Sequence, residues 1–319
     1  MRGPARRVGV LDIGCFSAHV MVIDRTDGSP LRPTYNHKVR LRLDHALDKN
    51  GRLSSDGVEQ VSRAVTEIVR RVRHDVDLLA FATSSIRDAV NAERVIRQVA
   101  RRTGVELLTF TGEQEAHLSY IAARHWFGHS SGPLTVLDVG GGTAEVAAGT
   151  GTRPHTTISL PFGARTLTQW GVDNGLSLRK LRDNVSADVE KALQDTDLAG
   201  LAVGCSKVMQ QLARLTGARP QREGPFVERN LRLHDLRRWI PRLAGLTAAQ
   251  RAELPGISRH RARQSLAGAV VVEALLAATG HESVRICPWS TQEGLLLELL
   301  EWPGSVASWV YDVSAKQPA

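Results

Sequence analysis

The chain has 319 residues, of which 42% are hydrophobic and 23% charged, as in a folded protein with one large or two medium domains. Its most apolar run, 266–280, contains Glu273 and is too short to span a membrane, and the N-terminal apolar run is too short for a signal peptide. Three widely spaced cysteines exclude a disulfide framework and a zinc site with paired ligands, so we expect a cytoplasmic protein. The net charge of +8 suits polyanions, but no motif for specific nucleic-acid binding accompanies it.

The predicted elements alternate between strands and helices along most of the chain. Buried runs between turn residues indicate strands, and amphipathic runs behind capping residues indicate helices. In chain order we expect strands 8–11 and 18–23, helix 56–73, strand 78–82, helix 91–102, strand 105–110, helix 112–127, strands 134–137, 144–148 and 155–160, a short helix from Gly163, helix 176–193, strand 198–204, a helix from Ser206, and helices 233–240, 258–278 and 291–300. This alternation predicts an α/β fold.

Two of the expected strand pairs are copies of each other. Residues 10–20 read V-L-D-I-G-C-F-S-A-H-V, and residues 136–146 read V-L-D-V-G-G-G-T-A-E-V. The spacing is too long for a solenoid repeat, so it indicates a duplicated domain with one β-hairpin in each copy. The segment 127–133, F-G-H-S-S-G-P, is the expected boundary.

The turns of these hairpins carry residue types that bind phosphate and metal. Backbone N–H groups of a glycine-rich turn can hold an anion, and a hydroxyl adds a donor. The second turn supplies Gly140, Gly141, Gly142 and Thr143. Asp12 and Asp138 stand where the first strands end, and Glu145 follows the second turn; such carboxylates suit Mg²⁺. The residues alone also allow a turn without a ligand, in which the aspartates accept hydrogen bonds from turn amides.

Five segments, in order, resemble motifs of the Ppx/GppA family of exopolyphosphatases and guanosine pentaphosphate phosphatases. F-A-T-S-S-I-R-D-A-V-N at 81–91 resembles A-T-x-x-x-R-x-A-x-N, T-G-E-Q-E-A-H-L at 111–118 resembles S-G-x-E-E-A-x-L, and D-V-G-G-G-T-A-E at 138–145 resembles D-I-G-G-G-S-x-E. S-L-P-F-G-A-R-T-L at 159–167 resembles S-L-P-x-G-A-x-x-L, and C-P-W-S-T-Q-E-G at 287–294 resembles C-P-W-A-L-R-E-G. The match is closest to the short actinobacterial exopolyphosphatases.

The resemblance implies an actin-like (ribonuclease H-like) duplicated ATPase fold, with two α/β domains flanking a cleft. We expect an N-terminal domain at 1–128, a C-terminal domain with helical insertions at 129–302 and a loosely ordered tail at 303–319. The resemblance also implies that Glu115 is the general base and that Arg87 contacts phosphate. The expected site comprises the catalytic residues Glu115, Asp138 and Glu145, the metal ligands Asp12, Asp138 and Glu145, and the phosphate-binding residues Gly14, Cys15, Phe16, Ser17, Arg87, Gly140, Gly141, Gly142 and Thr143.

This set predicts a phosphohydrolase that uses Mg²⁺, with Mn²⁺ as the alternative, and removes the terminal phosphate from inorganic polyphosphate. Guanosine pentaphosphate is a second candidate substrate. The sequence leaves the oligomeric state open, with a homodimer among the options. An actin-like kinase or ATPase is the competing enzyme class, but no clear adenosine pocket can be found in the sequence.

The first turn departs from the family pattern D-x-G-S-N-S/T, because Cys15 and Phe16 replace a serine and an asparagine. Gln114, Gln292 and Val208 likewise replace a glutamate, an arginine and a threonine of the family motifs. Each lost hydrogen bond to a charged group costs on the order of 1.5–3 kcal/mol. The sequence therefore keeps a second interpretation: a weak or inactive paralogue that binds polyphosphate or guanosine tetra/pentaphosphate as a regulatory module.

Overall fold

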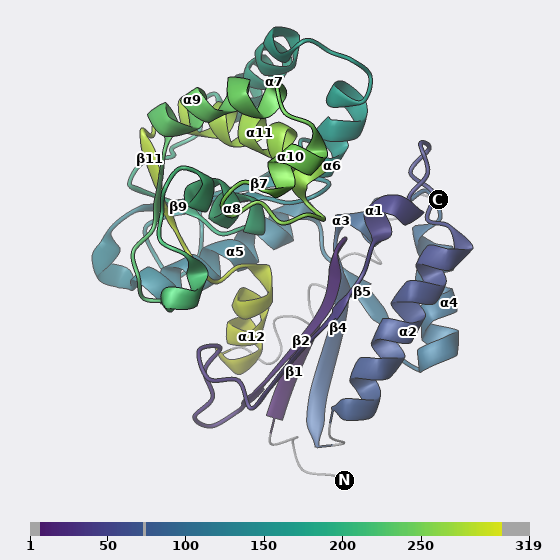
Figure 1. Cartoon of the computed structure of the whole chain (residues 1–319). Coiled ribbons are helices and arrows are strands. Elements are labelled where there is room, and N and C mark those ends of the chain that lie inside the picture. The colour runs from purple at the N-terminus through teal and green to yellow at the C-terminus, as the bar shows by residue number, and fades with distance from the viewer. Residues whose placement is uncertain (1–6, 73–74, 302–319) are drawn as a thin grey trace. The chain divides into compact units, whose positions relative to one another are not determined.

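The computed structural model describes residues 7–72 and 75–301, which form two compact units (Figure 1). Unit 1 runs to Phe110 and resumes at Gln292, and unit 2 is Thr111–Thr291. This division differs from the expected ranges 1–128 and 129–302. The expected tail, 303–319, and the last residue of the helix expected at 56–73 lie outside the described residues. No described helix combines the length and apolarity needed to span a bilayer.

Unit 1 is built on a five-stranded sheet with the order β3-β2-β1-β4-β5. The pairs β1–β2 and β2–β3 are antiparallel, whereas β4 is parallel to both β1 and β5. Its elements are β1 (Arg7–Ile13), β2 (Ser17–Asp24), β3 (Tyr35–Arg40), α1 (Leu43–Ala46), α2 (Ser55–Arg71), β4 (Val76–Ala82), α3 (Ser84–Arg87), α4 (Ala92–Thr103), β5 (Leu107–Thr109) and α12 (Thr291–Glu301), the first residue of which belongs to unit 2.

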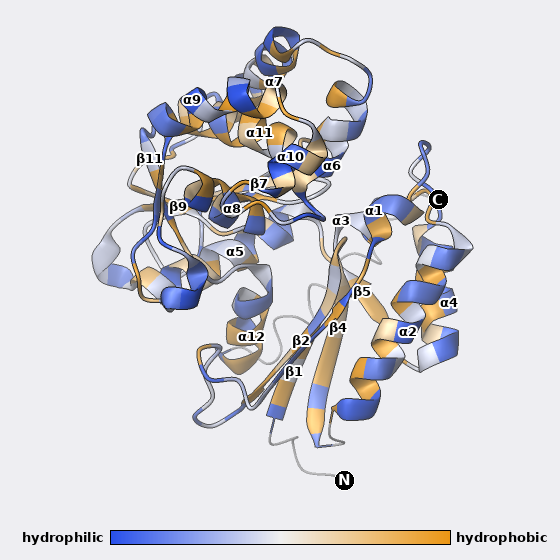
Figure 2. Ribbon diagram, viewed as in Figure 1, coloured by the Kyte–Doolittle hydropathy of each residue, from blue (hydrophilic) through white to orange (hydrophobic). Residues whose placement is uncertain are grey.

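Helices α2 and α4 cover the sheet of unit 1 with amphipathic faces (Figure 2). The Ser54 hydroxyl caps α2 by accepting from the Gly57 amide over 3.2 Å. The buried stripe of α2 joins the apolar cluster formed by β1, β2 and β4, and its members include Val58, Val61, Val65 and Ile68. Burial of this stripe, more than helix propensity, stabilises α2.

Unit 2 is built on a six-stranded sheet with the order β10-β11-β9-β6-β7-β8. The strands β6, β7 and β8 form an antiparallel meander, and β9 is parallel to β6 and β11. Its elements are α5 (Gly112–Phe127), β6 (Leu134–Val139), β7 (Ala144–Gly149), β8 (Thr156–Leu160), α6 (Ala164–Leu167), α7 (Leu178–Leu193), β9 (Leu201–Gly204), α8 (Lys207–Leu215), β10 (Asn230–Arg232), α9 (Leu233–Ala244), α10 (Ala248–Ala252), α11 (Ser265–Ala278) and β11 (Ser283–Ile286).

The central strands of unit 2 are covered on both faces, because every residue of β6 and β7 is buried. Leu137, Val139 and Val146 pack into the apolar cluster that contains α7 and α11. Side chains alternate along a strand, so Asp138 and Glu145 point to the opposite face, where α5 crosses β6, β7 and β8. The two acids of the central strands thus lie on the α5 side of this sheet.

The two units share one plan, as the internal repeat predicted. In each, a three-stranded meander precedes a parallel strand that pairs with the first strand of the meander. The hairpin turns also match: the Gly14 amide donates to the Ser17 carbonyl over 2.9 Å, and the Gly140 amide donates to the Thr143 carbonyl over 2.9 Å. Repetition of the topology and of the turn hydrogen bond confirms the duplicated α/β architecture.

Candidate active site

Three acidic side chains of unit 2 lie between its sheet and α5. Asp138 and Glu145 are directly opposite each other in the β6–β7 ladder and therefore point to the same face. Glu115 lies one turn before Ser119 on α5, and Ser119 Oγ donates to Asp138 Oδ2 over 2.9 Å. The three acids are 4–9% exposed. The three residues that the sequence proposed as catalytic are therefore all buried in unit 2, two on the sheet and one on the helix that covers it.

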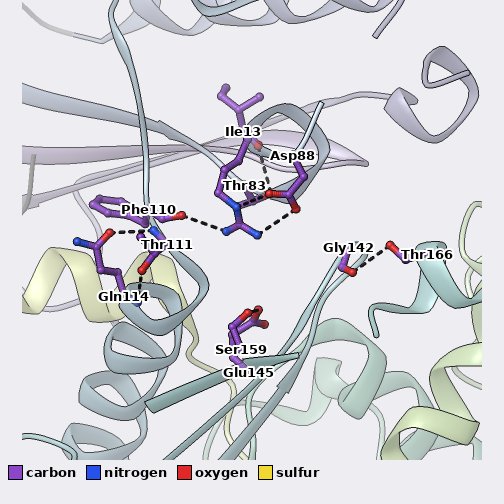
Figure 3. A network of polar contacts seen from close by, with 11 residues as sticks. Ile13, Thr83, Asp88, Phe110, Thr111, Gln114, Gly142, Glu145, Ser159 and Thr166 are labelled. Carbon is purple, nitrogen blue, oxygen red and sulfur yellow. Dashed lines mark hydrogen bonds and ion pairs between the residues drawn. The ribbon is translucent and has the colours of Figure 1, made fainter. Parts of the chain in front are cut away.

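The start of α5 lies close to Glu145. Thr111 and Gln114 form a reciprocal capping box, with donor–acceptor distances of 2.8 and 3.2 Å (Figure 3). Ser159 stands opposite Glu145 in β8, and its Oγ donates to Glu145 Oε1 over 3.3 Å. A Cβ on Gly112 would lie 1.9 Å from Ser159 Oγ, so only glycine lets the helix start approach this closely. The N-terminus of α5, which is the positive end of the helix dipole, thereby lies beside the Glu145 side chain.

Burial disfavours the charged form of Asp138 and raises the pKa of its carboxyl to about 6, while the hydrogen bond from Ser119 acts in the opposite direction. A second acid, Glu145, lies directly opposite, and like charges at such a position repel. A cation would relieve both costs. Mg²⁺ takes oxygen ligands, uses one or two carboxylates and keeps several waters, so Asp138 and Glu145 fit it. Within residues 7–72 and 75–301, no group of three or more His, Cys, Asp or Glu side chains could enclose a metal.

The glycine-rich turn of unit 2 is held by the start of α6. The Gly141 carbonyl accepts from the Arg165 and Thr166 amides at 2.8 and 3.1 Å. The Gly142 carbonyl accepts from the Gly163 amide at 2.9 Å and from the Thr166 hydroxyl at 3.0 Å (Figure 3). A Cβ on Gly163 would come within 2.4 Å of the turn backbone. This contact explains the glycine of the S-L-P-F-G-A-R segment.

The backbone amides of this turn differ from its carbonyls in their hydrogen bonding. In the described part of the chain, no acceptor takes a hydrogen bond from the amides of Gly141, Gly142 and Thr143. Successive donors of this kind form an anion-binding concavity. Residues 141–143 thus have backbone donors that suit an anion, whereas the Gly140 amide donates within the turn.

The corresponding turn of unit 1 has the same backbone but apolar side chains. The Cys15 carbonyl accepts from the Leu43 amide over 3.0 Å, and the Phe16 carbonyl accepts from the Leu41 amide over 2.9 Å. Cys15 and Phe16 are 8% and 5% exposed and belong to the apolar cluster of unit 1. Their side chains contribute to the core, so phosphate binding at residues 14–17 would depend on the backbone and on the Ser17 hydroxyl.

Asp12 and Arg87 also lie in unit 1, near the ends of neighbouring strands. Asp12 stands opposite His19 in the β1–β2 ladder, at the position where unit 2 has Glu145. Arg87 ends the short helix α3 that follows β4, and its guanidinium contacts Asp88 at 2.7 and 3.1 Å and the Phe110 carbonyl at 3.1 Å. The two hairpins have therefore diverged in charge, with Asp and His in unit 1 and Asp and Glu in unit 2.

Ser119 and Ser159 contact the acids of unit 2, although sequence reasoning gave neither of them a role there. In unit 1, the Gln292 amide group donates to the carbonyls of Val10 and His19 over 3.0 and 2.9 Å, and so binds both strands of the first hairpin. Ser119 lies four residues after Glu115, on the same face of a helix, and this spacing was the available signal. Ser159 precedes L-P-F-G-A-R, and only the strand register reveals its contact with Glu145.

Comparison with known proteins places this arrangement in a family. The model of the Ppx/GppA phosphatase family matches residues 21–302. Exopolyphosphatase 1 of Mycobacterium tuberculosis is 40% identical over 304 residues, which cover 92% of this chain and 88% of that protein. An uncharacterized protein of Streptomyces coelicolor is 43% identical over 311 residues, covering 92% of this chain and 90% of that one.

Solved structures share the fold at low sequence identity. A PPX-GPPA enzyme of Aquifex aeolicus gives a TM-score of 0.74 at 23% identity, over 92% of this chain and 99% of that one. An exopolyphosphatase of Cytophaga hutchinsonii gives 0.76 at 18% identity, over 92% and 98%. These matches and the repeated sheet topology confirm the expected duplicated, actin-like α/β fold.

Proposed function

The chain belongs to the Ppx/GppA phosphatase family, and we propose that it is an exopolyphosphatase, which hydrolyses the terminal phosphoanhydride bond of inorganic polyphosphate. One observation carries the proposal: the glycine-rich turn and the buried acids Glu115, Asp138 and Glu145 occur together in unit 2. Guanosine pentaphosphate, which also ends in a phosphoanhydride, is a second candidate substrate.

Each part of unit 2 has a role in this reaction. The amides of residues 141–143 would hold phosphate oxygens, as backbone donors do in other anion sites. Glu115 would accept a proton from the water that attacks the terminal phosphorus, while the bond from that phosphorus to the bridging oxygen breaks. Asp138 and Glu145 would hold Mg²⁺, or Mn²⁺, which neutralises phosphate charge when bound. In unit 1, Arg87 and residues 14–17 would be phosphate ligands and Asp12 a metal ligand, as the family resemblance implies.

The test is phosphate release from long-chain polyphosphate, with Mg²⁺ and after chelation. Glu115→Gln removes the proposed base and should lower kcat on the order of 10²- to 10⁴-fold. Glu113→Gln is the matched control, because Glu113 lies in the same helical turn but is exposed, and it should leave kcat unchanged. An active wild type whose rate survives Glu115→Gln would refute the assignment of the base.

One observation favours a second candidate, a module that binds polyphosphate or guanosine tetra/pentaphosphate without turnover. The Cys15 and Phe16 side chains lie in the core of unit 1, so the first turn offers fewer polar groups than the family pattern. Saturable binding of polyphosphate without phosphate release, with either metal present, would select this candidate. Analytical ultracentrifugation of the same samples would show whether the chain forms a homodimer, the option that the sequence left open.

A further inference from the structure

Ser119, in the middle of α5, contacts the neighbouring sheet instead of its own helix. Its side chain is 1% exposed, and Oγ donates to Asp138 Oδ2 over 2.9 Å. A buried helical serine often bonds to the carbonyl four residues earlier. Ser62 in α2 follows that pattern, because its Oγ donates to the Val58 carbonyl over 2.8 Å. The Ser119 hydroxyl is therefore directed at the Asp138 carboxylate, and this hydrogen bond is not one that the helix needs in order to form.

A third group continues this contact. Ser119 Oγ lies 3.2 Å from Thr291 Oγ1. A hydroxyl has one proton, and an ionised carboxylate only accepts. While Ser119 donates to Asp138, the proton between the two hydroxyls must therefore come from Thr291. Thr291, Ser119 and Asp138 form a directed chain of hydrogen bonds, in which each bond polarises the next.

We propose that Ser119 is a positioning residue, which holds Asp138 so that Oδ1 faces the divalent cation, and that Thr291 orients the Ser119 hydroxyl. The inference rests on the proposed function, in which Asp138 is a metal ligand. The Ser119 hydroxyl occupies Oδ2, so Oδ1 is the oxygen assigned to the ion. Hydrogen-bonded partners of metal ligands fix ligand orientation, and their loss typically costs 10–100-fold in metal affinity or activity.

Electron paramagnetic resonance of Mn²⁺ titrated into the metal-free protein measures this role without catalysis. Ser119→Ala should weaken Mn²⁺ binding by about 10–100-fold, and Ser119→Thr, which keeps the hydroxyl, should restore it. Thr291→Val removes only the second hydroxyl and should give a smaller loss. Ser62→Ala is the control for deleting a buried helical hydroxyl and should bind Mn²⁺ as the wild type does. Urea unfolding of each variant confirms that it is folded.

Kinetics supply a second readout. In Ser119→Ala, the Mg²⁺ concentration for half-maximal phosphate release should rise while the KM for polyphosphate stays unchanged. If Asp138→Asn loses Mn²⁺ binding and both Ser119→Ala and Thr291→Val bind Mn²⁺ like the wild type, the role of Ser119 is refuted and the metal site stands. If Asp138→Asn itself binds Mn²⁺ like the wild type, the metal site of the proposed function fails, and this inference fails with it.

Discussion

Asp138 has a higher pKa in the folded chain than its ordinary value of 3.8, because burial raises it to about 6. Between these values the folded state holds more protons than the unfolded state, so the free energy of unfolding should fall as the pH rises from about 4 to about 6. A rise in pKa from 3.8 to about 6 corresponds to a loss of about 3 kcal/mol in the free energy of unfolding across this pH range. Urea unfolding of metal-free protein across this pH range measures the loss. Asp138→Asn, which has no carboxyl at this position, should not show this part of the pH dependence.

The metal dependence follows from the same group. Above about pH 6 Asp138 is ionised, and a cation that binds only the folded protein should then raise Tm. We expect Mg²⁺ to raise Tm at pH 7.5 in the wild type but not in Asp138→Asn. If the free energy of unfolding depends on pH in the same way in the wild type and in Asp138→Asn, the pKa of Asp138 is not raised by folding, which contradicts the pH prediction above.

Phe16 gives a prediction that differs from the one its sequence motif suggests. By the family pattern alone, replacing Phe16 with asparagine would restore a polar group to the first turn. Because the ring is 5% exposed within the apolar cluster of unit 1, Phe16→Asn should instead bury an amide and remove core volume. We expect a destabilisation of about 3–5 kcal/mol, by analogy with Phe→Ala in cores, and no gain in kcat. Urea unfolding and phosphate release measure the two effects, and a stable variant with a higher kcat would contradict the prediction.

At this scale the sequence pointed to the acids and glycines proposed for the site, but not to the side chains that contact them. Asp138, Glu145 and Gly140 stand out because they occur in a repeated motif. The motif also resembles a family pattern, which gives Glu115 its expected role. Ser119 and Ser159 carry no such mark, because their contacts with the acids arise from a helix crossing a sheet and from strand register. Contacts between residues distant in sequence were not available to motif reasoning.

At the scale of elements, the turn of unit 2 and helix α6 act as one piece. A Cβ on Gly163 would lie 2.4 Å from the backbone of Gly141 and Gly142. Gly163→Ala should therefore displace the turn and lower kcat/KM for polyphosphate by at least tenfold, since small shifts of binding groups are costly in catalysis. Gly151→Ala is the matched control, because a Cβ there meets nothing within 4 Å and its φ is not positive. Equal rates for the two variants would show that the turn does not bind substrate.

The ends of an element were predictable where capping marks them. Helix α5 has the predicted bounds, 112–127, because Thr111 and Gln114 form the capping box and Gly128 follows the last turn. Strand β3 was missed, since its inward positions include His37 and its outward ones are polar. Helix α11 begins at Ser265, later than the expected 258, because residues 262–264 form a 3-10 turn before the continuous apolar run. Short strands such as β10 carry too little periodicity to be seen.

At the scale of the whole molecule, the duplication was readable from the repeat, but the limits of the units were not. The segment 127–133 has the composition of a linker, yet it lies inside unit 2. The buried Arg124 guanidinium donates to the carbonyls of Gly128, Gly132 and Gly149 at 2.9–3.3 Å, and so ties the end of α5 and this segment to β7. The composition of 127–133 indicated a domain boundary, whereas in the structure this segment is a loop that is hydrogen-bonded to Arg124 within unit 2.

This difference can be tested with two fragments of similar size. Residues 111–291 keep α5 over β6, β7 and β8, together with the bonds of Ser119 and Arg124, and should fold with a cooperative urea transition. Residues 129–302 lack α5, which would expose the face of the sheet that carries Asp138 and Glu145 and leave it without cover. That fragment should aggregate or unfold without cooperativity, because a sheet needs both faces covered when every residue of its central strands is buried. Far-UV circular dichroism and urea unfolding of both fragments decide the question, and an equally cooperative 129–302 would show that α5 is not part of unit 2.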